Sequence, residues 1–129
     1  MVVTIILLVI VWTLLHLTIF MPVLNHLNGT TQDLSAFENL KENFNQLLFF
    51  LMLTWTLAAF GEEIVYTGYL QKRILDLFGD TRSEIILAVG ISSLLFGLAH
   101  TEQGTIGVIL TFLDAIFFSL IKIHYRNNL

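Results

Sequence analysis

The stretch FNQLLFFLMLTWTLAAFGEEIVY, residues 44–66, decides the fold class. Residues 44–60 carry no formal charge, and two adjacent acids, Glu62 and Glu63, then lie between apolar side chains. An uncharged run of this length approaches the roughly 20 residues that a helix needs to cross the hydrocarbon core of a bilayer. The stretch therefore predicts a membrane-spanning helix that carries two carboxylates at its end.

Three further apolar runs cover residues 2–24, 85–99 and 106–121. The chain of 129 residues is 56% hydrophobic and 12% charged, with a mean hydropathy of +0.81, so it has too few polar side chains to cover a soluble core. Backbone polar groups in lipid need partners within the protein, and these segments are too few to close a barrel. We therefore expect an all-α integral membrane protein with about four transmembrane helices, in contact with membrane lipids.

The composition also excludes several classes of function. The absence of cysteine excludes disulfide frameworks, thiolate nucleophiles and cysteine-ligated metal centres. With only six Lys and Arg residues and a net charge of −4, the chain lacks the basic patch that a phosphate backbone requires. We expect no nucleic-acid partner.

Residues 1–43 are interpreted as an N-terminal membrane anchor helix followed by a polar loop. The first run has no Lys or Arg before it and no small-residue cleavage site after it, which favours an uncleaved anchor over a signal peptide that is removed. Lys and Arg gather in residues 61–84 and in the C-terminal tail, at Lys122 and Arg126. This distribution favours a cytoplasmic location for both termini.

The two adjacent acids are placed to have different roles. On an α-helix neighbouring residues point about 100° apart, so Glu62 shares a face with Tyr66 and Arg73, whereas Glu63 shares a face with Thr67. One carboxylate can then face a site while the other supports it. The alternative is that the pair only marks the interfacial end of a span.

A turn signal at residues 79–83, GDTRS, separates this segment from the third run, with Ser83 as a candidate N-cap for a helix that starts at Glu84. The third run ends in Phe96-Gly97-Leu98-Ala99-His100. Small residues on this helix, among them Gly97, allow a neighbouring helix to approach closely. The two segments are therefore predicted to form an antiparallel helical hairpin.

The register of this hairpin brings two chemically useful groups to one height. Glu62 lies 19 residues before Thr81, the centre of the turn, and His100 lies 19 residues after it. A carboxylate and an imidazole that meet around a water molecule form a general-base arrangement. The alternative for His100 is an interfacial polar group at a helix end.

The hairpin makes residues 44–78 a nearly continuous helix, roughly 52 Å long and far longer than the bilayer is thick. Gly61 or Gly68 is a candidate position for a break in this helix. Alternatively, residues 69–78 lie along the interface as an amphipathic segment. The sequence leaves both open.

Asp114 lies within the fourth run, far from either end. An acid at that depth is costly and indicates function, although a role in helix packing is an equal alternative. His100 is its candidate partner across the intervening turn. The other histidines, His16, His26 and His124, have no partner at metal-ligand spacing and are interpreted as structural or interfacial.

Two segments, EEIVYTGYL at 62–70 and SSLLFGLAH at 92–100, resemble the first two motifs of the CPBP (Abi) family of CAAX-prenyl endopeptidases and bacteriocin-processing or immunity proteins. The family pattern is Glu-Glu-x-x-x-Arg-Gly, then Phe-x-x-x-His, and the resemblance runs from Leu57 to the C-terminus. It implies that Glu62 activates the attacking water, with His100 as its partner and Glu63 and Phe96 in support. It further implies a glutamate-dependent mechanism that needs no metal and no other cofactor.

The resemblance also implies a substrate and a location. The substrate would be a membrane-associated peptide or protein, such as the C-terminal tripeptide of a prenylated protein or a bacteriocin precursor. The protein would lie in the bacterial plasma membrane. We therefore expect an intramembrane endopeptidase that hydrolyses a peptide bond at the membrane.

The sequence departs from the family pattern at two places. Thr67 stands where the family has Arg, and Arg73 is a candidate substitute for that cation. The family continues into another helix with a second His and a following Asn or Asp, groups implied to stabilise the oxyanion. Residues 44–129 are thus interpreted as a CPBP-like membrane domain that lacks the last family motif.

Two alternatives to an active protease stay open. One is a catalytically inactive or incomplete family member that acts as a membrane binding or bacteriocin-immunity protein, which Thr67 and the missing last motif favour. The other is a small transporter or channel subunit that uses Asp114 and Glu62 for ions. In each case, four helices with an open groove lead us to expect a homodimer or a partner membrane helix.

Overall fold

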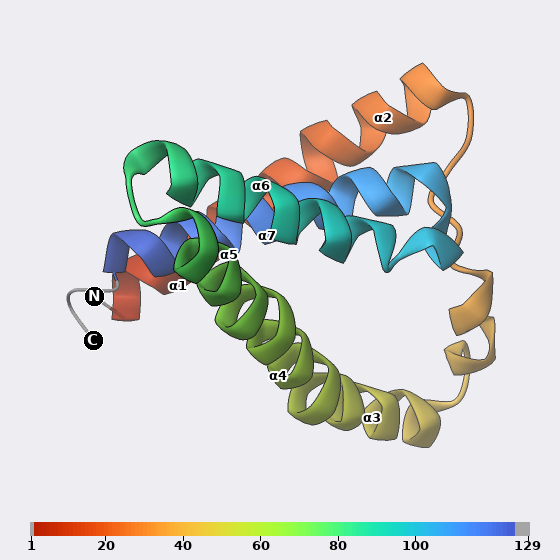
Figure 1. The fold of residues 1–129 in the computed structure, drawn as a ribbon. Helices are drawn as coiled ribbons and strands as arrows, with labels where there is room; N and C mark the ends of the chain where they lie inside the picture. Colours follow the sequence, from red (N-terminus) through yellow and green to blue (C-terminus); the bar gives the residue numbers. More distant parts are fainter. Residues whose placement is uncertain (1, 126–129) are drawn as a thin grey trace. The chain divides into compact units, whose positions relative to one another are not determined.

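The computed structural model describes residues 2–125, and Figure 1 shows that they are helical nearly throughout. No strand occurs among these residues, so the predicted all-α fold class is confirmed. The helical segments in chain order are α1 (Val2–Leu15), η1 (His16–Phe20), α2 (Met21–Asn28), η2 (Ser35–Leu40), α3 (Phe44–Leu53), η3 (Thr54–Ala58), α4 (Ala59–Glu62), η4 (Glu63–Leu70), α5 (Gln71–Phe78), α6 (Arg82–Leu98), η5 (Thr101–Gln103) and α7 (Gly104–Tyr125). Segments η1, η3 and η4 are π-helical, and η2 and η5 are 3₁₀-helical.

The chain divides into two compact units, which are described separately. One unit combines residues 1–33 with residues 97–129, and the other comprises residues 34–96. Within residues 2–125, three continuous helical stretches are long and apolar enough to cross a membrane: Val2–Asn28, Phe44–Phe78 and Thr101–Tyr125. The third predicted run, residues 85–99, lies mostly in α6 (Arg82–Leu98), which is helical but has only 17 residues. The protein is an integral membrane protein.

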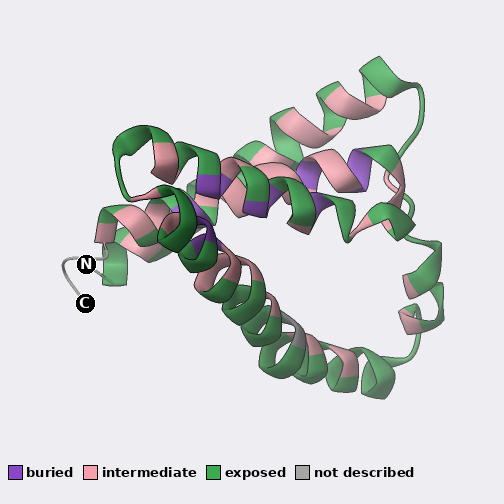
Figure 2. Ribbon diagram, viewed as in Figure 1, coloured by how far each residue is buried: buried purple, intermediate pink, exposed green. Residues whose placement is uncertain are grey.

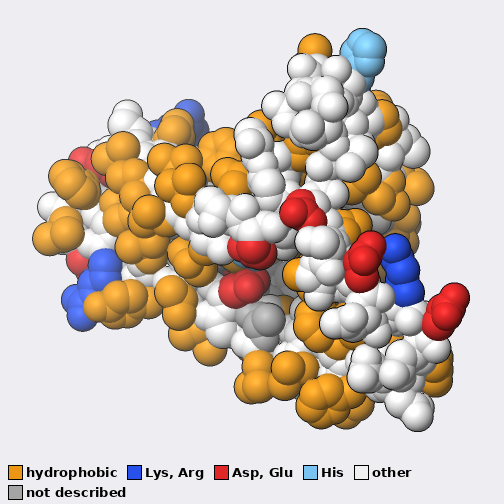
Figure 3. Space-filling model, turned by 90° about the vertical axis from the view of Figure 1, so that its right-hand side faces the viewer, with side chains coloured by type: hydrophobic (Ala, Val, Ile, Leu, Met, Phe, Trp, Pro, Cys, Tyr) orange, Lys and Arg blue, Asp and Glu red, His pale blue; other side chains and the backbone are white. Residues whose placement is uncertain are grey.

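The surface of the helices agrees with a lipid environment. Many large hydrophobic side chains are exposed, and α1 and α3 contain no buried residue at all. Figure 2 shows how little of the chain is buried, and Figure 3 shows hydrophobic side chains over much of one face, with charged groups in separate spots. Apolar area of this extent is rare on proteins that face water.

The stretch Phe44–Phe78 stays helical along its whole length, with Gly61 in α4 and Gly68 in the π-helical segment η4. It begins at Asn43, whose side-chain Oδ1 accepts a hydrogen bond of 3.1 Å from the backbone N–H of Gln46. Neither glycine ends the helix, although Gly68 lies where the helix departs from α-geometry. What interrupts the α-geometry instead are the two π-helical segments η3 and η4, in which the backbone bonds reach one residue further back.

A similar π-helical segment in the N-terminal helix has an identifiable cause. Pro22 lies two residues after η1, and a proline ring in an α-helix would clash with the carbonyl of the residue four positions earlier, Thr18. The wider turn of η1 removes that conflict, so the helix continues through Pro22 to Asn28. The predicted anchor helix thus extends four residues beyond Leu24.

The turn between α5 and α6 is built differently from its prediction. The helix α6 begins at Arg82, so the predicted N-cap at Ser83 is wrong. The carboxylate of Glu84 accepts a 2.7 Å hydrogen bond from the backbone N–H of Thr81, which is the Ser/Thr-x-x-Glu capping box. Hydrogen bonds from the side chain and backbone of Thr81 lower the pKa of Glu84. Gly79 has φ +110°, and a Cβ there would lie 2.6 Å from the Glu84 carboxylate, so the turn requires glycine.

The unit of residues 34–96 contains the predicted antiparallel hairpin. The ring of Tyr66 meets the ring of Phe96 edge to face at 5.2 Å, and Nε2 of the buried Gln71 donates a 3.0 Å hydrogen bond to Oγ of the buried Ser92. Both pairs are centred at or beside residue 81. The predicted register of the hairpin is therefore confirmed within this unit.

The other unit joins the N-terminal helix to α7. The less exposed side chains of residues 2–20 recur every three or four positions and form one face: Ile5, Val9, Trp12, His16 and Phe20. At the end of α6, a Cβ on Gly97 would lie 2.8 Å from the carbonyl oxygen of Val108 and 3.0 Å from Cβ of Phe112. The predicted close approach of a neighbouring helix at Gly97 is confirmed.

Candidate active site

The two motif acids lie at the start of a π-helical segment. Glu62 ends α4 and caps η4, and Glu63 is the first residue of η4. Glu62 is half-buried and Glu63 is exposed, so adjacent carboxylates occupy different environments as the sequence suggested. Segments of π-helix are uncommon and often occur at functional sites. The π-helical turn is thus an independent reason to look for function at these residues.

The wider turn of η4 changes which residues share a face. The backbone N–H of Gln71 bonds to the carbonyl of Tyr66, five positions back, where an α-helix would use the fourth. The faces that we derived from α-helical spacing therefore do not carry through η4. Thr67, at the position of the family arginine, lies inside η4 and is half-buried.

Arg73, the candidate substitute for the family arginine, lies on α5. Its guanidinium is 5.3 Å from the centre of the Tyr69 ring and 3.9 Å from the carboxylate of Asp76, and its side chain is largely exposed. Both contacts are with neighbours on the same helical stretch, at the spacing typical of surface pairs. The supporting role of Arg73 at the motif stays a prediction.

His100 lies on a tight turn between α6 and α7. Its backbone N–H donates to the carbonyl of Gly97 at 3.0 Å, and its own carbonyl accepts from the N–H of Gln103 at 3.1 Å. The side chain is half-buried. His100 thus caps η5 on a fixed backbone. It belongs to the unit of residues 2–33 and 97–125, whereas Glu62, Glu63 and Phe96 belong to the other unit, so their pairing stays a prediction.

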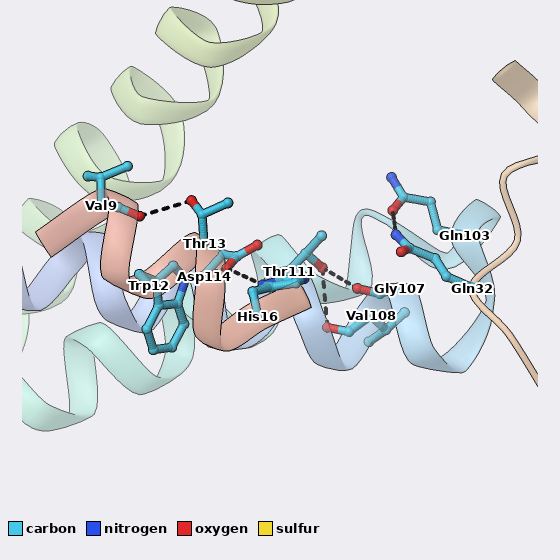
Figure 4. Close-up of polar contacts among 10 residues, drawn as sticks. All are labelled: Val9, Trp12, Thr13, His16, Gln32, Gln103, Gly107, Val108, Thr111 and Asp114. Carbon is cyan, nitrogen blue, oxygen red and sulfur yellow. Dashed lines mark hydrogen bonds and ion pairs between the residues drawn. The ribbon is translucent and has the colours of Figure 1, made fainter. Parts of the chain in front are cut away.

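Asp114 has partners that the sequence did not indicate. Its Oδ1 accepts a 2.7 Å hydrogen bond from the indole Nε1–H of Trp12 and lies 3.1 Å from Nδ1 of His16. Figure 4 shows these side chains meeting between the N-terminal helix and α7. The Trp12 ring also stacks on Phe117, with centroids 4.2 Å apart and planes 5° from parallel. The partners found for Asp114 are thus Trp12 and His16, whereas the sequence suggested His100.

A second contact joins the two ends of the same unit near the turn of His100. Nε2 of Gln32 donates a 2.7 Å hydrogen bond to Oε1 of Gln103, and the backbone N–H of Asp33 donates to the carbonyl of Gln103 at 3.0 Å. Sequence reasoning missed Gln32 and Gln103, because neither belongs to a motif and a neutral amide pair carries no charge signal.

Within residues 2–125, no group of three or more His, Asp or Glu side chains comes together in a way that suits a metal ion. The start of the segment in which the family would continue to its last motif, residues 126–129, lies outside the described residues.

The family was identified by comparison with known proteins. The family model described as type II CAAX prenyl endopeptidase Rce1-like matches residues 44–129, a range that contains Glu62, Glu63, Phe96 and His100. No curated protein and no solved structure matches the chain. The matched range covers two thirds of the chain and includes both motifs that carry the resemblance seen in the sequence. The chain therefore belongs to the type II CAAX prenyl endopeptidase Rce1-like family.

Proposed function

We propose that this protein is an intramembrane endopeptidase in which Glu62 activates a water molecule with His100 as its partner. The observation that carries the proposal is the family match over both motifs, together with the position of Glu62 at the start of a π-helical segment. In this proposal Glu63 is the supporting carboxylate, and Phe96 holds the hairpin through Tyr66.

The hairpin register supports the pairing of the two groups. The pairs Tyr66–Phe96 and Gln71–Ser92 set the register inside one unit. Glu62 lies four residues before Tyr66, and His100 lies four residues after Phe96, so the same pairing continued outward by four residues would set the two opposite each other. The proposal extends this register to His100, which follows the end of α6.

The proposed chemistry is hydrolysis of a peptide bond by an activated water. Glu62 accepts a proton from the water as the oxygen bonds to the carbonyl carbon, and His100 orients that water by a hydrogen bond. The tetrahedral intermediate then breaks its carbon–nitrogen bond while Glu62 passes the proton to the leaving amine. No redox step occurs, and both hydrogens of the water end on the two products.

The proposed substrate is a peptide held at the membrane by its own lipid or apolar segment. The family match favours the C-terminal tripeptide of a prenylated protein, and the wider resemblance adds a bacteriocin precursor as the second candidate. The proposal also includes a bacterial plasma membrane, both termini on its cytoplasmic side, and a homodimer or partner helix beside the apolar helices.

A non-catalytic binding or immunity role is the second candidate function, and Thr67 favours it. The family has an arginine at this position, and without that cation the acidic pair loses a positive neighbour that would hold the carboxylates in place. This candidate keeps the fold and the membrane location and predicts no peptide cleavage.

The deciding experiment measures cleavage of a prenylated, membrane-tethered reporter by the full chain in vesicles. Glu62→Gln and His100→Ala should each abolish cleavage without lowering expression. Glu38→Gln and His124→Ala are matched controls outside the proposed site and should cleave like the native chain. Cleavage that persists in both motif variants would overturn the protease proposal. An expressed native chain that cleaves neither reporter nor bacteriocin precursor would favour the binding role.

A further inference from the structure

The turn that carries His100 is short and depends on support from outside itself. Between the end of α6 at Leu98 and the start of α7 at Gly104, the only regular element is η5, which has three residues. The two backbone hydrogen bonds that flank His100 link it to Gly97 and Gln103. The conformation of the turn therefore depends on where Gln103 is held.

Gln103 is held by two consecutive residues from the other end of the unit. The side chain of Gln32 donates to its side chain at 2.7 Å, and the backbone N–H of Asp33 donates to its carbonyl at 3.0 Å. The two bonds fix both the backbone and the side chain of Gln103. A pair of bonds to one residue restricts its orientation more than either bond would alone.

Two glycines allow the conformation of the chain beside this contact, one through space and one through its backbone angle. A Cβ on Gly107 would collide with Cβ of Gln103, so the Gln103 side chain can lie over the first turn of α7 only because residue 107 has no side chain. Gly104 adopts φ +74°, and a Cβ there would lie 4.0 Å from Cβ of Asp33. The start of α7 thus needs glycine at position 107 to make room for Gln103 and at position 104 for its backbone conformation.

The segment that reaches this turn is itself anchored. The helix Val2–Asn28 contacts α7 through Trp12 and His16, which both meet Asp114. From Asn28 the chain needs only a few residues to reach Gln32, and the side chain of Asn28 donates to Oγ1 of Thr30 on the way. Movement of the N-terminal helix along α7 would therefore pull on the turn that carries His100.

We infer that Gln32 is a positioning residue for His100 and acts through Gln103. The inference rests on the proposed function, in which His100 is the partner of Glu62. The N-terminal helix lies outside the range matched by the family model. In this inference the helix takes part in the reaction, because it anchors the strap of residues 29–33. The strap in turn sets the angle of the His100 imidazole. Small misplacements of a reacting group reduce rates by up to about 100-fold, so the effect belongs in kcat.

Kinetics with matched variants test the inference. Gln32→Leu keeps the side-chain size but removes the donor, and it should lower kcat about tenfold with KM unchanged. Gln103→Leu should do the same, and the double variant should be no slower than either single variant, because one interaction is lost in all three. The single variant Gln103→Glu keeps an acceptor for Gln32 and should therefore retain the native kcat. Native kcat in Gln32→Leu, in a protein that His100→Ala inactivates, would overturn the inference.

A spectroscopic readout separates this inference from the proposed function. The imidazole carbon signal of His100 is assigned by its loss in His100→Ala. It should shift in Gln32→Leu and keep its native position in Gln103→Glu, while the signal of His124 at the far end of α7 stays in place in both variants. An unmoved His100 signal would overturn the inference whatever the activity. Full cleavage by His100→Ala would instead refute the proposed function, and the shift would still decide whether Gln32 positions the imidazole.

Discussion

The indole Nε1 of Trp12 donates a hydrogen bond of 2.7 Å to Oδ1 of Asp114, a residue 102 positions further along the chain. The same oxygen lies 3.1 Å from Nδ1 of His16. Asp114 is inside a span that is apolar enough to cross a membrane, where an acid without partners would be costly. Trp12 and His16 lie one turn apart on the N-terminal helix, so they bring two polar groups to one carboxyl.

We predict that this hydrogen bond stabilises the contact between the N-terminal helix and α7. Trp12→Phe removes the donor but keeps an aromatic ring to stack on Phe117. Hydrogen bonds between membrane helices contribute about 0.6 kcal/mol on average and up to about 1.7 kcal/mol. A double-mutant cycle of Trp12→Phe with Asp114→Leu, measured as free energy of unfolding in mixed micelles, should show a coupling in that range. Strict additivity of the two substitutions would contradict the prediction.

Sequence reasoning located the hairpin because its signals are local. The turn at residues 79–83 and the rise of a helix together fix which residues face each other, so the pairs Tyr66–Phe96 and Gln71–Ser92 fall near the predicted centre. The same reasoning misplaced the N-cap by choosing Ser83, although Thr81 and Glu84 spell a capping box. Thr81 and Ser83 are both residue types that cap helices well, and only the geometry of the turn decides between them.

Two features of the site could not be predicted for physical reasons. The partners of Asp114 lie about a hundred residues away, and helical periodicity carries no information on which distant helix a side chain meets. The π-helical segment at Glu63–Leu70 breaks the spacing on which face assignments rest, and no residue in it compels a wider turn. By contrast, the π-helical turn before Pro22 has a cause that the sequence displays.

The polar pair inside the hairpin should behave asymmetrically when it is changed. Gln71 Nε2 donates to Oγ of Ser92, and both residues are buried. Ser92→Ala leaves the Gln71 amide without this acceptor and should lower the free energy of unfolding by about 1–3 kcal/mol. The double variant Gln71→Leu/Ser92→Ala removes both polar groups and should recover most of that loss. Thermal unfolding in detergent measures both, and a double variant that is weaker than Ser92→Ala would contradict the prediction.

The close approach of α6 and α7 at Gly97 should not tolerate a methyl group. A Cβ there would lie 2.8 Å from the backbone oxygen of Val108, which cannot rotate away, so Gly97→Ala should destabilise by about 1–3 kcal/mol. Gly90, on the same helix, has nothing within 4 Å of its Cβ position. Gly90→Ala is therefore a matched control and should stabilise by up to about 1 kcal/mol through helix propensity. Equal effects of Gly97→Ala and Gly90→Ala would refute the close approach of α6 and α7 at Gly97.

The capping box should make the turn between α5 and α6 sensitive to acid. Hydrogen bonds from Thr81 lower the pKa of Glu84 from its usual 4.5, so the folded state binds a proton less readily than the unfolded state. This stabilisation is fully present above pH 4.5 and is lost as the pH falls through the lowered pKa. The difference in melting temperature between the native chain and Glu84→Gln should therefore shrink below that pH. A difference that does not vary with pH would contradict this role.

The contact between the strap and the start of α7 can be trapped chemically, because the chain contains no cysteine of its own. A Cβ on Gly104 would lie 4.0 Å from Cβ of Asp33, inside the range of about 3.5–4.5 Å that disulfides span. The double variant Asp33→Cys/Gly104→Cys should form an intramolecular disulfide under mild oxidation, although a side chain at φ +74° and ψ −178°, a conformation nearly confined to glycine, costs about 1–3 kcal/mol. Mass spectrometry after alkylation measures the yield. The pair Asp33→Cys/Thr105→Cys, shifted by one residue, is the control and should react more slowly. Free thiols in the first pair would mean that residues 32 and 33 do not rest on the turn of His100.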